Sequence, residues 1–61
     1  QSPVAYLLSY RLEKAKQLLA SGSGTIEEIS RLCGFRSSGY FCRMFRKHTG
    51  LTPGQYRKAF L

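Results

Sequence analysis

A chain of 61 residues can form one small domain with a modest core, which is too little for most catalytic clefts and effector pockets. Its two cysteines form no CxxC or Cys/His spacing, which excludes a disulfide framework and a recognisable metal site, and no apolar run is long enough to cross a bilayer. Ten basic residues face three acidic ones for a net charge of +7, and residues 31–61 contain no acid at all, a one-sided charge typical of proteins that bind nucleic acid.

The first predicted helix covers residues 3–20. Ser2 is a typical N-cap, and Pro3 fits the first helical position. Apolar residues then recur at helical spacing as far as Leu19. The Ser and Gly residues at 21–24 end the helix, because glycine tolerates the left-handed conformation found at helix ends.

The second predicted helix is short and covers residues 26–33. Thr25 and Glu28 have the spacing of a capping box, in which each side chain accepts a hydrogen bond from the backbone N–H of the other residue. Ile26, Ile29 and Cys33 are predicted to share one face of this helix, with Leu32 beside it, and Ile29 and Leu32 are expected to pack against the apolar side of the next helix.

A tight turn and a longer helix follow. Gly34 can adopt the positive φ that such a turn needs, and Phe35 supplies an apolar plug behind it. The third predicted helix covers residues 38–49, from an N-cap at Ser37 to a stop at Gly50. A short helix, a turn and a longer helix are the proportions of a helix-turn-helix motif, which lays its second helix in the major groove of DNA.

The third predicted helix has two distinct sides. The apolar side, expected to pack in the core, carries Phe41, Met44, Phe45 and His48. The other side is small at its start and basic towards its end, and it carries Gly39, Cys42, Arg43, Arg46 and Lys47. Arg43 is long enough to donate two hydrogen bonds to a guanine, worth about 1–3 kcal/mol of discrimination between bases. Phosphate contacts, which orient the helix without reading sequence, are predicted for Arg36, Ser37, Arg46 and Lys47.

The last predicted helix covers residues 53–60 and starts at Thr52-Pro53. Its free N–H groups form a further predicted phosphate site, with Arg57 nearby. Since no segment alternates like a strand, we predict an all-α fold, a small bundle of about four helices with a homeodomain-like helix-turn-helix. The start Ser2-Pro3-x-x-Tyr6 matches Thr52-Pro53-x-x-Tyr56; this is either chance or the sign of a repeat, in which case the chain is a segment of a longer protein.

The sequence as a whole resembles the AraC/XylS family of transcription regulators. The resemblance covers nearly the whole chain and rests on Arg11–Leu19, Ile26-x-x-Ile29, Gly34-Phe35, Tyr40-Phe41-x-Arg43-x-Phe45-Arg46-Lys47 and Gly50-x-Thr52-Pro53-x-x-Tyr56-Arg57. Such regulators read DNA with two helix-turn-helix units joined by a long helix. The resemblance implies that residues 3–20 are that linking helix, that 25–60 are the second unit, and that Gln1-Ser2-Pro3 is the tail of the first.

The resemblance also implies roles for individual residues. By position, the base-facing sites are Ser38, Gly39, Cys42 and Arg43, whereas Arg46 and Arg57 match backbone-contacting or structural basic sites. The chain departs from the family pattern at Ser30, where alanine is usual, and at Gly39, which has no side chain with which to read a base. The resemblance thus implies a promoter-binding activator segment in the bacterial cytoplasm, at the nucleoid, with ligand sensing and dimerisation in a separate domain.

Three classes of function remain. We favour a regulator that binds double-stranded DNA; the alternatives are a basic module for an acidic partner such as RNA polymerase, and a helix bundle on an anionic membrane surface. The helix stops and caps favour a globular fold over the membrane. An enzyme is not expected, because three glutamates and one histidine make no recognisable acid–base or nucleophile set. We expect no cofactor, no metal and no small-molecule ligand in this segment.

Three single residues have simple interpretations. Cys33 is expected to be a buried, inert thiol. Cys42 is interpreted as a small exposed residue, with contact to a thymine methyl or sensing of oxidation as the alternatives. His48 is expected at the boundary of the apolar side rather than as a ligand.

Overall fold

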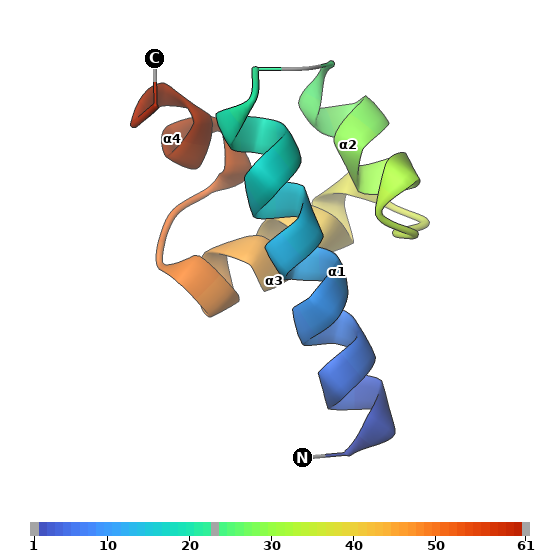
Figure 1. Cartoon of the computed structure of the whole chain (residues 1–61). Coiled ribbons are helices and arrows are strands. Elements are labelled where there is room, and N and C mark those ends of the chain that lie inside the picture. The colour runs from blue at the N-terminus through green and yellow to red at the C-terminus, as the bar shows by residue number, and fades with distance from the viewer. Residues whose placement is uncertain (1, 23, 61) are drawn as a thin grey trace.

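Four helices make up the fold seen in a computed structural model, which describes residues 2–22 and 24–60. They are α1 (Pro3–Ala20), α2 (Ile26–Leu32), α3 (Ser38–Thr49) and α4 (Pro53–Lys58), and no strand occurs in the described ranges (Figure 1). The all-α prediction is confirmed. The second and fourth helices end earlier than predicted, at Leu32 and Lys58. The expectations that involve Gln1 and Ser23 lie outside the described residues.

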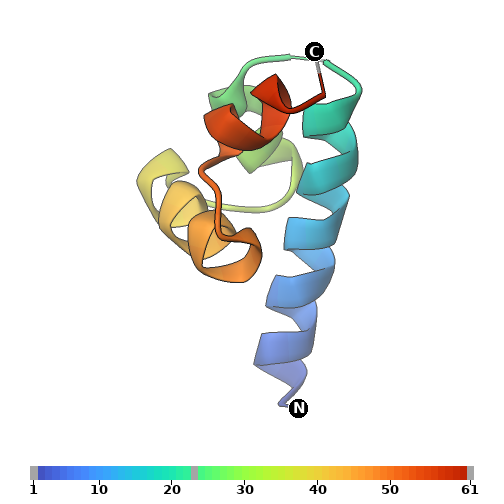
Figure 2. The same ribbon diagram turned by 90° about the vertical axis from the view of Figure 1, so that its left-hand side faces the viewer.

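The long helix α1 is the support on which the other helices pack. The shorter helices α2, α3 and α4 lie against its middle and C-terminal turns, while its N-terminal turns project beyond them (Figures 1 and 2). The burial of its side chains follows this arrangement. Leu12, Ala15 and Leu19 are buried, whereas Val4 and Tyr6 on the projecting turns are exposed.

The predicted helix starts are confirmed. The Ser2 hydroxyl accepts a hydrogen bond from the Ala5 N–H at 3.1 Å. In the capping box of α2, the Glu28 N–H donates to the Thr25 hydroxyl at 3.1 Å and the Thr25 N–H donates to the Glu28 carboxylate at 2.8 Å. The hydrogen bond from the Thr25 backbone lowers the pKa of the Glu28 carboxyl. Thr52 caps α4 in the same reciprocal way.

A series of aromatic rings forms the centre of the core. Phe35 packs on Phe41 with ring centroids 5.0 Å apart, Phe41 on Phe45 at 5.7 Å, and Phe45 on Tyr56 of α4 at 5.4 Å. The series joins the turn, α3 and α4 into one apolar interior. The buried hydrophobic side chains are Leu12, Ala15, Leu19, Ile29, Cys33, Phe35, Phe41 and Phe45.

Helix α2 and its C-cap turn the predicted face, with Ile29 and Cys33, to the core, but Leu32 lies outside it. Its buried side is centred on Ile29, Ser30 and Cys33, and burial raises the pKa of the Cys33 thiol as expected for an inert cysteine. The prediction that Leu32 faces the core is wrong, since Leu32 is 72% exposed. Each helical residue is turned about 100° from the last, so a helix that buries Cys33 and Ser30 turns Leu32 outward. Buried Ser30 is satisfied by donating to the Glu27 carbonyl at 2.8 Å.

The turn between α2 and α3 depends on Gly34 for two reasons. Its φ of +90° lies in the left-handed region. A Cβ at this position would also lie 3.1 Å from Nε of Arg11, because the Arg11 side chain of α1 lies directly over the turn. The turn is therefore shaped both by its own backbone and by the neighbouring helix.

Replacing Gly34 by alanine is expected to lower the free energy of unfolding by about 1–2 kcal/mol from backbone strain, with the displacement of Arg11 in addition. Urea denaturation measures the loss. Gly54→Ala is the matched control, because Gly54 is helical and a Cβ there meets nothing within 4 Å; it should leave stability unchanged or raise it by up to about 1 kcal/mol. Equal stabilities of the two variants would contradict this account of the turn.

Candidate nucleic-acid interface

Helix α3 separates an aromatic face from a basic one. Phe41 and Phe45 are both 0% exposed and fix which side of the helix faces the core. The opposite side is open to solvent and carries Gly39, Arg43, Arg46 and Lys47. The orientation of the helix thus follows from burial of two phenylalanines, and the basic side is presented outward as a consequence.

The acidic residues all have partners outside this basic side. Glu13 binds Lys16 and His48, Glu27 pairs with Arg31 at 4.0 Å, and Glu28 belongs to the capping box of α2. Within residues 2–22 and 24–60, no ion pair involves Arg36, Arg43, Arg46 or Lys47. No carboxylate of the described residues pairs with these four side chains, so they form a positively charged surface that attracts anions.

Both ends of α3 are held by its own backbone and caps. At the N-terminus, the Ser37 hydroxyl accepts a hydrogen bond from the Tyr40 N–H at 3.2 Å. At the C-terminus, Gly50 takes a φ of +86° and its N–H donates to the Arg46 carbonyl at 2.7 Å. These contacts confirm the predicted cap and stop, and they make the helix a rigid support for its outward side chains.

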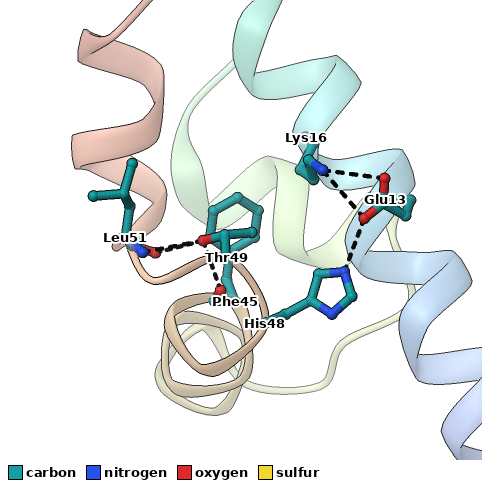
Figure 3. A network of polar contacts seen from close by, with 6 residues as sticks. All are labelled: Glu13, Lys16, Phe45, His48, Thr49 and Leu51. Carbon is teal, nitrogen blue, oxygen red and sulfur yellow. Dashed lines mark hydrogen bonds and ion pairs between the residues drawn. The ribbon is translucent and has the colours of Figure 1, made fainter.

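A polar contact also joins the last turn of α3 to α1. His48 Nε2 lies 2.8 Å from the Glu13 carboxylate, which Lys16 also contacts at 3.2 Å (Figure 3). The hydrogen bonds from His48 and then from Lys16 hold the pKa of the Glu13 carboxyl below its ordinary value. His48 does lie at the edge of the apolar side. Its partner, 35 residues away in the chain, could not be found from helical spacing.

The four residues predicted to face the bases divide into two pairs. Gly39 and Arg43 are exposed, whereas Ser38 and Cys42 are only partly exposed. Cys42 packs against the core cluster, so its interpretation as an exposed residue has to be corrected. It follows Phe41 directly and therefore lies at the edge of the buried face. Among the four, Arg43 alone combines a long polar side chain with an exposed position.

The residues predicted to bind phosphates also divide. Arg36, Ser37, Arg46 and Lys47 are exposed at the turn and along α3. Arg57 of α4 contacts its own chain instead: its guanidinium donates to the Leu19 carbonyl at 3.2 Å and to the Gly24 carbonyl at 2.6 Å. These contacts tie α4 to the end of α1 and to the following loop. The structure therefore gives Arg57 a role in holding the fold, and a phosphate contact by this residue stays a prediction.

Tyr40 is a feature of the interface that the sequence reasoning missed. The Arg43 guanidinium carbon lies 6.0 Å from the centre of the Tyr40 ring, and that ring lies 6.1 Å from the ring of Phe35. The available signal was a tyrosine three residues before an arginine on one helix, a spacing that brings side chains together.

A groove of about 430 Å³ lies beside the start of α3. It separates the projecting turns of α1 from the turn that precedes α3, and its lining is mostly apolar but includes two arginines. The lining residues are Val4, Leu7, Leu8, Arg11, Gly34, Phe35, Arg36, Ser37 and Tyr40. Tyr40 thus forms part of the groove wall as well as contacting Arg43.

Other kinds of site find little support in the described parts of the chain. Residues 2–22 and 24–60 contain no cluster of three His, Cys, Asp or Glu side chains that could hold a metal ion. In the same ranges, no helix has the length and apolar character needed to span a membrane.

Comparison with known proteins finds close relatives. A family model described as a helix-turn-helix domain matches residues 1–59. The chain is 46% identical to the uncharacterized HTH-type transcriptional regulator YijO of Escherichia coli K12, over 90% of this chain and 19% of that protein. It is 45% identical to the HTH-type transcriptional activator RhaR of Pectobacterium carotovorum (92% of this chain, 20% of that protein) and 44% identical to the transcriptional activator AggR of Escherichia coli (88% and 20%).

The matched region is a small part of each relative. The chain spans about a fifth of the length of these curated proteins. No solved structure matches it.

Proposed function

This chain belongs to the AraC-type helix-turn-helix family, and we propose that it binds double-stranded DNA as part of a transcription regulator, with α3 lying in the major groove. The relatives named as transcriptional activators support a role in gene activation. The proposal places that role at the bacterial nucleoid. Promoter binding by the whole protein and contact with RNA polymerase belong to the same proposal.

The observation that carries the proposal is the outward side of α3. Its cations have no acidic partner among the described residues, and they stand on a helix whose other side is locked in the core by Phe41 and Phe45. A rigid helix about 18 Å long, with one basic and uncovered side, fits a major groove about 12 Å wide. The described ranges contain no comparable group of side chains that would indicate a catalytic or metal-binding site.

We assign different tasks to the cations. Arg43 lies in the middle of the outward side and reads a base edge, where its planar guanidinium can form two parallel hydrogen bonds with guanine. Arg36 in the turn before α3, and Arg46 and Lys47 one turn after Arg43, bind phosphates, which supplies affinity without sequence preference. Gly39 lets the helix backbone approach the bases closely. Arg57 is left out of this group because its guanidinium already contacts two backbone carbonyls.

Salt dependence of duplex binding tests the proposal. Three phosphate-binding cations predict that log K falls with log salt at a slope of roughly −2.7. Arg46→Ala should flatten the slope by roughly 0.9, since one counterion fewer is released. Arg57→Gln is the matched control: it should leave the slope unchanged while lowering the melting temperature.

A binding competition separates the candidate functions. The chain is titrated with a random duplex, with vesicles of anionic lipid and with an acidic protein, the RNA polymerase α subunit, each at the same concentration of negative charge. Preference for the duplex supports the proposal. Preference for the vesicles, or for the polymerase subunit with no measurable duplex binding, would refute it.

A further inference from the structure

The position of Arg43 on α3 raises the question of what holds its guanidinium in place. A residue on a helix surface touches side chains three and four positions away. For Arg43 these are Gly39, which has no side chain, Arg46 and Lys47, which repel it, and Tyr40. Among these neighbours, Tyr40 alone can attract the guanidinium.

The ring of Tyr40 is suited to this task because it also lies against a residue of the core. Phe35, which is 5% exposed, lies 6.1 Å from the Tyr40 ring and itself packs on buried Phe41 at 5.0 Å. Tyr40 remains 42% exposed, so the ring reaches from the core to the surface of the interface. Arg43 stands over it at 6.0 Å, within the range of a cation–π contact.

We infer that Tyr40 is a positioning residue for base recognition: its core-anchored ring holds the Arg43 guanidinium over the outward side of α3, ready to bind a guanine. The inference rests on the proposed function, because it presumes that Arg43 reads a base. An arginine side chain loses rotamer freedom when it is fixed, which costs binding free energy. A ring that restricts the arginine side chain before DNA binds reduces the entropy lost on binding. Only contacts that need one defined geometry, such as two hydrogen bonds to a base, become stronger as a result. Phosphate contacts tolerate several geometries and gain little.

The inference makes Tyr40 important for selectivity rather than for overall affinity. A cation–π contact at an exposed site contributes about 0.5–1 kcal/mol, which corresponds to a two- to fivefold change in binding. We therefore expect Tyr40→Leu to reduce the ratio of specific to random binding about two- to fivefold, while binding to random duplex stays the same. Leucine keeps an apolar side chain in the groove wall beside Phe35.

The experiment measures dissociation constants for two duplexes: one enriched by the unaltered chain from a random library, and one of shuffled sequence. The variants are Tyr40→Leu, Tyr40→Phe and Tyr40→Trp, each with Arg43 and with Arg43→Ala, and each checked for folding by its thermal transition. Phe and Trp keep an aromatic face and should preserve the ratio to within twofold. When Arg43 is already alanine, Tyr40→Leu should not lower the ratio of specific to random binding any further, because Tyr40 is proposed to act on that ratio only through Arg43.

The other outcomes are distinguishable. Equal losses on both duplexes for Tyr40→Leu, or a loss for Tyr40→Phe as large as for Tyr40→Leu, would overturn the inference, because the first indicates a general structural role and the second a contact made by the hydroxyl. If Arg43→Ala alone leaves the ratio unchanged, base reading by Arg43 fails and the inference fails with it. If Arg43→Ala lowers the ratio while Tyr40→Leu does not, only the inference is overturned. If Tyr40→Leu fails to fold, Tyr40→Trp is compared with the unaltered chain, with Arg43 and with Arg43→Ala. A lower ratio of specific to random binding for Tyr40→Trp would then contradict the inference, because Trp keeps the aromatic face.

Discussion

Replacing Phe45 by alanine is expected to lower the free energy of unfolding by about 3–5 kcal/mol. Phe45 is 0% exposed and lies in the middle of the ring series, 5.7 Å from Phe41 and 5.4 Å from Tyr56. Its removal leaves a cavity exactly where α3 and α4 meet. At about 0.05–0.15 kcal/mol per residue, a chain of 61 residues has a total stability of only about 3–9 kcal/mol. The substitution should therefore remove at least about a third of the stability, and all of it at the lower end of that range.

Thermal and urea unfolding followed by far-ultraviolet circular dichroism measure this loss. Leu32→Ala is a suitable control, because it also shortens an apolar side chain but one that is 72% exposed; its effect should stay within about 0.5 kcal/mol. A Phe45→Ala variant that unfolds at the same urea concentration as the Leu32→Ala variant would contradict the core described above.

Arg43→Ala is expected to reduce the preference for a selected duplex over a shuffled one by about 1–3 kcal/mol, or five- to 150-fold. The effect is large because the other predicted base-facing residues offer little: Gly39 has no side chain, and Ser38 and Cys42 are partly covered. Discrimination therefore depends mainly on one guanidinium. Dissociation constants for both duplexes at one fixed salt concentration give the ratio.

The matched variant is Arg46→Ala, which removes the same side chain one turn further along α3. Since Arg46 is assigned to phosphate, both duplexes should be bound more weakly by the same factor and the preference should persist. Equal behaviour of the two variants, whether both lose preference or both keep it, would refute the division of tasks between Arg43 and Arg46.

Much of the fold could be predicted because its signals are local. The caps at Thr25 and Thr52 involve residues three apart in the chain, and the stop at Gly50 depends on one residue's freedom to adopt positive φ. Such contacts form within one turn of helix, so the sequence specifies them directly. The same holds for the two sides of α3, where helical spacing alone separates Phe41 and Phe45 from Arg43.

Other features depend on how the helices pack. Spacing predicted the buried face with Ile29 and Cys33, but how far that face extends depends on the neighbouring helices, and the expectation that Leu32 packs in the core was wrong. The partners of Arg57 lie 38 and 33 residues away in the chain, and that of His48 lies 35 away. The position of the Tyr40 ring depends on Phe35, which the turn at Gly34 brings beneath it. By itself the sequence determined the four helices, the residues that cap their starts and the basic side of α3. The tertiary structure decided which cations hold the fold and which remain available for DNA, because that depends on distances between helices that no local pattern encodes.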